Sequence, residues 1–190
     1  MPPRAEMTKE VILDAAFQMV REQGLDVLTA RNIAQRLKCS TQPIYSAYGS
    51  MEQLKDDVYS RTVHFAIDSM QQYRNESNAS AMNLAIGCLM FARDEKQLFR
   101  TLLLSDYGTD YLKRNPDVMN EQMYAAFMQI DDGLASIPER NVQKMFLKLT
   151  AYWIGIGTMI NTGTLALDID EATEMLEEMF QALKEKEGLI

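Results

Sequence analysis

Apolar residues recur at intervals of three and four along almost the whole chain, and this spacing restricts the fold more than any other feature. From Thr8 onward, for example, Ile12, Ala16 and Met19 fall on one face of an α-helix. No segment between turn residues shows the sustained alternation of polar and apolar residues that is typical of a β-strand. We therefore predict an all-α fold without internal repeats.

Glycines and capping residues predict where the first helices begin and end. Gly24 is placed to end the first helix, and Thr29 can cap a second helix over residues 30–37. Ser50 and Gln53 form the capping box of a fourth helix, which extends to about residue 73.

A third helix is predicted over residues 41–48, with a cap at Ser40 and an end at Gly49. Pro43 would then be its third residue, where the N–H that proline lacks would have had no intrahelical partner. The proline therefore marks the start of this helix and does not break it.

Residues 74–80 are a polar hinge, and five more helices are predicted after it. We divide the chain into a helix-turn-helix domain, residues 1–50, and a larger helical domain, residues 51–190, for effector binding and dimerisation. The five helices cover residues 79–93, 96–105, 116–136, 138–161 and 169–186.

A helix, a tight turn and a short helix form a helix-turn-helix, whose second helix enters the major groove of DNA. Here residues 30–37 would be the supporting helix and residues 41–48 the recognition helix. Residues 40–51 carry no charged side chain, although 24% of the chain is charged. Base readout needs hydrogen-bonding groups and apolar groups for thymine methyls, so a neutral helix is compatible with reading DNA.

The recognition helix offers such groups on its exposed side. Ile44 is expected to point inward, whereas Tyr45 and Tyr48 can send their hydroxyls to phosphates or bury their rings. The predicted base-reading residues are Thr41, Gln42, Pro43 and Ser46. The cations expected to hold the DNA backbone are Arg31, Lys38 and Lys55.

The negative charge of the chain is unevenly distributed. The formal net charge is −8, but residues 1–55 hold seven Lys or Arg against six Asp or Glu, a net of +1. The remainder therefore carries −8 − 1 = −9. Acidity outside the first quarter limits non-specific binding to polyanions and leaves room for DNA at the N-terminal domain.

About residues 8–60 resemble the N-terminal domain of the tetracycline-repressor (TetR) family of transcriptional regulators. The resemblance rests on ILDAA, the break at Gly24, the cap at Thr29, IAQRL and IYSAYGSMEQL. In that family the recognition helix carries two spaced aromatic residues, here Tyr45 and Tyr48. The resemblance implies DNA contacts from Arg31, Thr41, Gln42, Pro43, Tyr45, Ser46 and Ser50.

Three residues depart from the family's pattern. Lys38 stands where the turn usually has a glycine, so it must adopt whatever backbone the turn imposes. Ala47 replaces the common histidine before the second aromatic residue. Met51 replaces the common lysine at the start of the fourth helix, which removes an expected phosphate contact.

The segments FARDEKQLFRTLLLSD and IGIGTMINTG resemble the family's effector domain. A regulator of this kind must bind a small molecule that prefers one of two domain arrangements, and the fourth helix would carry the coupling. Arg100 or Asn161 could orient the ligand, or could have a surface or capping role. The pocket for this molecule is expected among the middle helices, and its apolar lining predicts an apolar or aromatic effector. The residues expected to line it are Met90, Phe99, Leu103, Tyr107, Tyr111, Met123, Tyr124, Phe127 and Tyr152.

Two apolar stripes near the C-terminus predict a homodimer through a four-helix bundle, with part of each stripe in the intramolecular core. Gly155 and Gly157 would allow close helix approach. The first stripe is Val142, Met145, Phe146, Leu149, Trp153, Ile156 and Ile160. The second is Ala172, Met175, Leu176, Met179, Phe180 and Leu183.

Candidate catalytic and metal sites have simpler structural explanations. His64 is the only histidine, Cys39 fits a turn, and acids at residues 168–171 suit a helix start. Cys39 and Cys88 are expected to be reduced thiols. We predict no enzyme activity, metal or cofactor.

No membrane span or secretory signal is recognisable in the sequence, so we expect a cytoplasmic protein without membrane association. The predicted function is a ligand-responsive repressor that binds a palindromic operator as a homodimer. The alternative is an all-helical enzyme or scaffold that keeps a vestigial DNA-binding domain.

Overall fold

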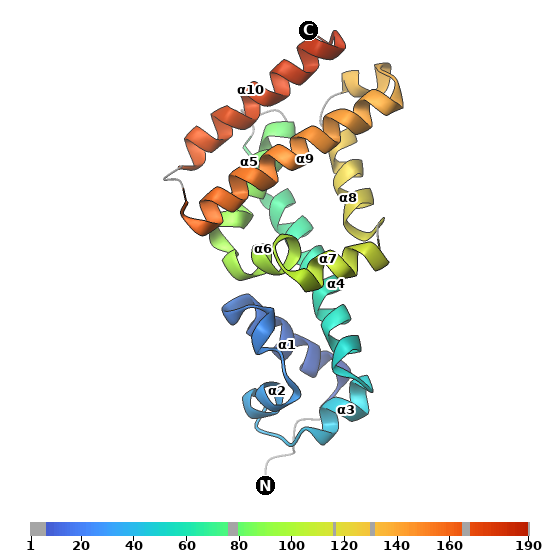
Figure 1. Cartoon of the computed structure of the whole chain (residues 1–190), viewed down its shortest axis with the longest axis vertical. Coiled ribbons are helices and arrows are strands. Elements are labelled where there is room, and N and C mark those ends of the chain that lie inside the picture. Colours follow the sequence, from blue (N-terminus) through green and yellow to red (C-terminus); the bar gives the residue numbers. More distant parts are fainter. Residues whose placement is uncertain (1–6, 76–79, 116, 130–131, 165–167, 190) are drawn as a thin grey trace. The chain divides into compact units, whose positions relative to one another are not determined.

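The computed structural model describes residues 7–75, 80–115, 117–129, 132–164 and 168–189. The described residues form ten α-helices, two short 3-10 helices and no β-strand, which confirms the all-α prediction (Figure 1). The chain divides into two compact units. Unit 1 contains residues 1–65 and 97–114, and unit 2 contains residues 66–96 and 115–190.

Unit 1 contains the helix-turn-helix, the first part of α4 and two later helices. α1, α2 and α3 contact one another and bury Ile12, Ile33 and Ile44. α4 is one continuous helix whose last residue in unit 1 is Phe65. The helices are α1 (Lys9–Gln23), η1 (Leu25–Val27), α2 (Ala30–Arg36), α3 (Gln42–Tyr48), α4 (Met51–Gln72), α6 (Lys96–Leu103) and α7 (Asp106–Arg114).

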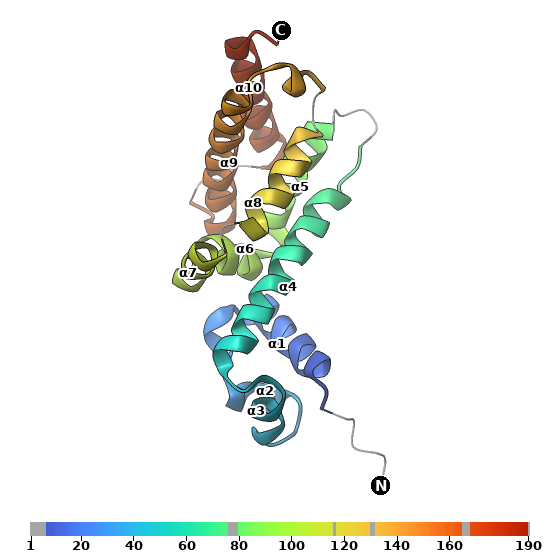
Figure 2. The ribbon, with the colours of Figure 1, turned by 90° about the vertical axis from the view of Figure 1, so that its right-hand side faces the viewer.

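Unit 2 is a helical bundle in which α5, α9 and α10 pack on one another. Figures 1 and 2 show α9 and α10 lying side by side. α5 packs tightly against the end of α4, because a Cβ added at Gly87 would lie 2.0 Å from the carbonyl oxygen of Met70. The helices after α4 are α5 (Ser80–Asp94), α8 (Asp117–Met128), η2 (Asp132–Ser136), α9 (Glu139–Thr162) and α10 (Ile169–Glu187).

The predicted caps of α2 and α4 are present. Thr29 Oγ1 accepts a hydrogen bond from Asn32 N at 3.2 Å, and Ser50 Oγ accepts one from Gln53 N at 3.2 Å. Gly24 has a φ of +88°, a conformation that a side chain would strain. In unit 2, Asp168 and Glu171 form a reciprocal capping box, which explains the acidic residues there.

The start of the recognition helix was predicted one residue too early. Thr41, not Ser40, precedes α3, and its side chain makes no capping hydrogen bond. Pro43 is therefore the second helical residue, where no N–H partner is required. Within the described residues, Lys38 is the only residue other than glycine with a positive φ, at +53°, so it accepts the left-handed backbone of the turn as expected.

Two later helices differ from the prediction. The helix expected over 96–105 ends at Leu103, and the prediction missed α7 altogether. Asp-Tyr-Gly reads as a turn, but Ser105 Oγ accepts from Gly108 N at 2.9 Å and starts a new helix. The helix expected over 116–136 is α8 followed by η2, and residues 116 and 130–131 of it lie outside the described residues, as do residues 76–79 of the hinge.

Candidate nucleic-acid interface and ligand cavity

α3 places an apolar side against unit 1 and a polar side toward solvent. Ile44 is buried as predicted, which locks the short helix onto the core. Thr41, Gln42 and Ser46 are exposed, and Tyr45 is 50% exposed. Exposed amide, hydroxyl and phenol groups on one helix side form a surface that can hydrogen-bond to base edges and phosphates.

Of the two roles predicted for Tyr48, a phosphate contact or a buried ring, the structure shows the buried ring. Its side chain is 3% exposed, and its hydroxyl is buried without a hydrogen-bond partner among the described residues. Lys9 Nζ lies 4.8 Å from the ring centroid. Burial, followed by the negative charge of Asp57, raises the pKa of Tyr48 above its ordinary value. Tyr48 therefore packs α3 onto unit 1, and we remove it from the proposed DNA contacts.

The Lys and Arg side chains of unit 1 differ in whether they already form ion pairs or ring contacts within the protein. Arg31 and Lys38 are exposed and have no ion pair within the described part of the chain. Arg36, in contrast, forms a two-bonded pair with Glu22 at 2.7 Å. Lys55 is half-buried, with Nζ 5.9 Å from the centroid of the Tyr107 ring. Arg31 and Lys38 are thus the better candidates for phosphate contacts.

Two residues predicted for a ligand pocket, Tyr107 and Tyr111, pack against Tyr59 in unit 1. Tyr59 is fully buried, and its ring centroid lies 4.3 Å from that of Tyr111 and 6.2 Å from that of Tyr107. The Tyr107 hydroxyl donates to Asp56 Oδ1 at 2.6 Å, and Arg114 Nη2 donates to the same oxygen at 3.0 Å. We call Tyr59, Tyr107 and Tyr111 the tyrosine cluster.

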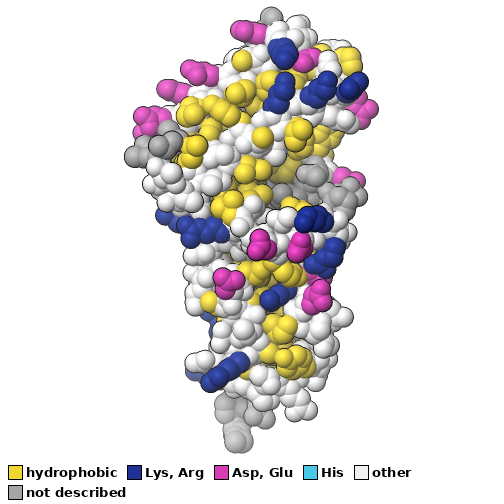
Figure 3. Space-filling view, in the orientation of Figure 1, with side chains coloured by type: hydrophobic (Ala, Val, Ile, Leu, Met, Phe, Trp, Pro, Cys, Tyr) yellow, Lys and Arg dark blue, Asp and Glu magenta, His cyan; other side chains and the backbone are white. Residues whose placement is uncertain are grey.

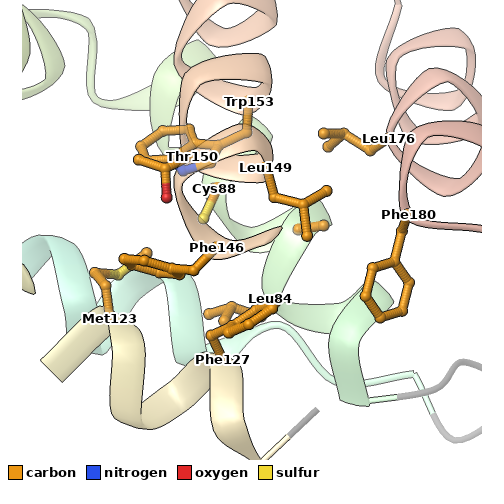
Figure 4. A pocket seen from close by; sticks show the side chains of 11 residues that line it. Leu84, Cys88, Met123, Phe127, Phe146, Leu149, Thr150, Trp153, Leu176 and Phe180 are labelled. Carbon is orange, nitrogen blue, oxygen red and sulfur yellow. The ribbon is translucent and has the colours of Figure 1, made fainter. Parts of the chain in front are cut away.

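A cavity of about 80 Å³ lies in unit 2, between α5, α8, α9 and α10 (Figure 4). The rings of Phe127 and Phe146 are 5.4 Å apart at their centroids, and Leu176 and Phe180 close the cavity from α10. The lining is Leu84, Ala85, Cys88, Met123, Phe127, Phe146, Leu149, Thr150, Trp153, Leu176 and Phe180. We call this space the apolar cavity.

The predicted pocket residues are divided between the two units. Phe99, Leu103, Tyr107 and Tyr111 belong to unit 1, whereas Met123 and Phe127 line the apolar cavity in unit 2. In unit 2, Tyr124 packs its ring on Phe146, Met90 lines a separate polar depression, and Tyr152 is half-buried. Helical spacing identified apolar faces but could not say which of them enclose a space.

Asn161 has the capping role that was one of its two predicted alternatives. It is 2% exposed, and Nδ2 donates to the carbonyl oxygens of Ala92 at 3.0 Å and Lys96 at 3.1 Å. Ala92 lies in the last turn of α5 and Lys96 begins α6, so the side chain ties α9 to the junction of α5 and α6. Arg100 is exposed.

The predicted dimer stripes lie largely inside unit 2. Buried members include Val142, Met145, Ile156, Ala172 and Leu183, and Trp153 is 9% exposed. Phe146, Met175, Met179 and Phe180 are half-buried. The large apolar side chains that α9 exposes are Leu147, at 68%, and Met159, at 38%, which the stripe did not include.

His64, Cys39 and Cys88 were the other residues considered in the sequence. His64 is exposed, with Nδ1 2.8 Å from the carbonyl oxygen of Ser60. Cys39 and Cys88 are free cysteines, and burial raises the pKa of Cys88 to about 12. Searching the described residues finds no group of three or more His, Cys, Asp or Glu placed to hold a metal ion. Across the same residues, no helix combines the length and apolar character that membrane crossing requires.

The sequence profile of "Bacterial regulatory proteins, tetR family" matches residues 12–58, from α1 into α4. None of the curated proteins compared with the chain matches it. Among solved structures, a TetR-like transcriptional regulator from Rhodococcus sp. RHA1 is 16% identical with a TM-score of 0.67, covering 95% of this chain and 97% of that one.

Two further structures are similar over most of the chain. MexZ, described as a key repressor responsible for antibiotic resistance in Pseudomonas aeruginosa, is 19% identical, with a TM-score of 0.62 and coverage of 94% and 96%. A putative transcriptional regulator from Saccharomonospora viridis, solved in complex with choline, is 16% identical, with a TM-score of 0.63 and coverage of 91% and 95%.

The tight turn between α2 and the exposed helix α3 has the arrangement of a helix-turn-helix DNA-binding protein. The family match covers this part of the chain, so residues 12–58 are similar to the DNA-binding domain of TetR-family transcriptional regulators.

Proposed function

We propose that this protein is a cytoplasmic repressor that binds a palindromic operator as a homodimer and responds to a small-molecule effector. The observation that carries the proposal is the neutral, exposed side of α3. Arg31 and Lys38 would contact phosphates beside it, and Gln42, Tyr45 and Ser46 would face the bases. The other proposed contacts are Thr41, Pro43, Ser50 and Lys55.

Charge complementarity supports a dimer through the outward side of α9 and α10. α9 begins with exposed Arg140, Lys144 and Lys148, and α10 begins with exposed acids from Asp170 to Glu178. Figure 3 shows hydrophobic side chains over these helices, with positive charge toward one end and negative charge toward the other. A twofold axis across this face would place the basic end of one copy on the acidic end of the other.

The apolar cavity is the proposed effector site. Its aromatic and aliphatic lining suits an apolar or aromatic molecule held by few polar groups. α4 starts directly after the recognition helix and continues without interruption into unit 2, so it offers a covalent route for coupling. An effector acts only if it prefers one of two arrangements of the protein.

The DNA-binding proposal is tested with Gln42→Ala and Tyr45→Ala in an electrophoretic mobility shift on DNA from the protein's own promoter. Both side chains are exposed, so the melting temperature should stay unchanged while operator affinity falls about fivefold or more for each lost base contact. Gln18→Ala, at an exposed position of α1, is the matched control and should bind normally. Unchanged affinity in the double variant would refute the placement of the recognition helix.

The dimer is tested by Leu147→Glu, which puts a charge on the exposed side of α9. The variant should be monomeric by sedimentation analysis and should lose operator binding, because one helix-turn-helix buries too little surface for specific binding. Leu104→Glu provides the control, since Leu104 is 45% exposed in unit 1. A Leu147→Glu protein that remains dimeric would place the interface elsewhere.

A further inference from the structure

The wall of the apolar cavity contains no charged side chain. Its eleven residues are aliphatic, aromatic or sulfur-containing, apart from Thr150. A charged ligand would lose its hydration there without a counter-charge to replace it, which is costly in an apolar environment. The cavity therefore selects against anions and against ammonium compounds, although aromatic rings alone can attract the latter.

Thr150 supplies a hydroxyl that the protein itself does not use. Helical threonines elsewhere, such as Thr62, Thr101 and Thr158, donate to the carbonyl oxygen four residues earlier at 2.7–2.8 Å. The Thr150 hydroxyl has no hydrogen-bond partner within the described residues. It is not fully buried either, so a ligand can reach it. Figure 4 shows it beside Phe146 and Trp153. It can give a ligand one directional contact.

The size of the cavity limits the ligand to a compact body. A dry cavity of about 150 Å³ in another protein admits benzene, so about 80 Å³ requires one wall to give way. The α5 wall is held by the contact of Gly87 with Met70 and by the hydrogen bond from Asn161 to the Ala92 carbonyl in the last turn of α5. The α10 wall consists of Leu176 and half-buried Phe180, and Phe180 can turn outward more readily.

We propose that the apolar cavity binds a compact, uncharged aromatic molecule with one hydrogen-bonding group, which Thr150 orients and for which Phe180 moves. The role of this molecule as an effector rests on the proposed function, whereas its binding does not require DNA. A simple phenol has the required chemistry and serves as the probe.

Binding is measured by calorimetry on the full chain with phenol, toluene, benzoate and choline. Trp153 is the only tryptophan in the sequence and lines the cavity, so its fluorescence reports occupancy of this site. Phenol should bind most tightly, toluene more weakly, and benzoate and choline least. Equal or tighter binding of benzoate or choline would overturn the proposal.

Two variants locate the site and its polar contact. Thr150→Val should lower phenol affinity roughly three- to tenfold and leave toluene affinity unchanged, because only phenol loses a hydrogen bond. Ala85→Leu should fill the cavity and abolish the binding of both phenol and toluene. Ala135→Leu, at an exposed position, should leave the binding of both compounds unchanged. Unchanged phenol binding in a folded Thr150→Val protein would overturn the proposal, as would unchanged binding in a folded Ala85→Leu protein.

The two proposals fail separately. If the unliganded protein does not bind its promoter DNA but phenol binds with the expected pattern, the proposed function is wrong and the ligand site stands. If operator binding is normal and phenol does not bind, the ligand class is wrong and the DNA-binding function stands.

Discussion

The tyrosine cluster of unit 1 and the apolar cavity of unit 2 use similar numbers of aromatic rings for different purposes. In the cluster, the hydroxyls of Tyr59 and Tyr107 donate to Leu102 O at 3.0 Å and Asp56 Oδ1 at 2.6 Å, and the ring centroids of Tyr59 and Tyr111 lie 4.3 Å apart. In the cavity, Phe127 and Phe146 have no polar atoms to bind, and about 80 Å³ stays open. Polar anchoring fixes ring positions, whereas apolar contact alone leaves room for a ligand.

The largest expected effect is a difference in unfolding free energy between a substitution in the tyrosine cluster and one in the apolar cavity. Tyr59→Ala should lower the free energy of unfolding by about 3–5 kcal/mol, because it empties a fully buried site that has one hydrogen bond. Phe180→Ala should cost less than about 2 kcal/mol, since Phe180 is half-buried and already borders open space. Urea denaturation measures both, and equal losses would contradict the comparison.

The next effect concerns the rigid wall behind the cavity. Gly87→Ala should destabilise by about 2–3 kcal/mol, because its Cβ would meet the backbone of Met70 at 2.0 Å. Gly155→Ala is the matched control: its Cβ meets nothing within 4 Å, and alanine favours a helix by about 0.5–1 kcal/mol. Thermal unfolding of the two variants should therefore shift in opposite directions. A stabilised Gly87→Ala protein would mean that the α5 wall is free to move.

High pH should distinguish buried groups in the two regions. Burial raises the pKa of Cys88 from 9.0 to about 12, and burial likewise raises the pKa of Tyr59 and Tyr107 above 10.0. The unfolded chain therefore loses these protons first, and the unfolding free energy falls as pH rises, from about pH 9 for the thiol and about pH 10 for the phenols.

Cys88→Ala should remove the part of this fall that begins near pH 9, which is about 1.4 kcal/mol per pH unit for one buried proton. Urea denaturation of both proteins between about pH 8 and about pH 11 measures the difference. Parallel curves for wild type and variant would show that the thiol ionises without unfolding.

The smallest effect concerns the polar anchor of the tyrosine cluster. Tyr107→Phe should cost about 1 kcal/mol, because the hydroxyl donates to a carboxylate in a partly exposed site. Tyr152→Phe in α9 is the control and should change stability little, since no hydrogen bond from its hydroxyl is found within the described residues. Equal changes in the two variants would show that the bond to Asp56 contributes nothing.

Local signals in the sequence determined much of the fold. Thr29, Ser50 and Asp168 were identified as caps because their hydrogen bonds reach only three residues along the chain. The turn at Lys38 and the neutral recognition helix followed from equally local spacing. The sequence analysis did not predict α7. Gly108 in this helix is buried, and its missing Cβ allows the carbonyl oxygens of Thr101 and Leu102 to approach.

The sequence by itself determined an all-α protein with a short helix after a tight turn, because helix period and caps depend on near neighbours. Only the tertiary structure decided that Tyr48 is buried, that Tyr107 and Phe127 belong to different units, and that α9 turns Leu147 outward. The physical reason is that the period of a helix shows which face is apolar but not what covers that face. Whether an aromatic ring fills a core, borders a cavity or meets solvent depends on contacts between helices far apart in the chain.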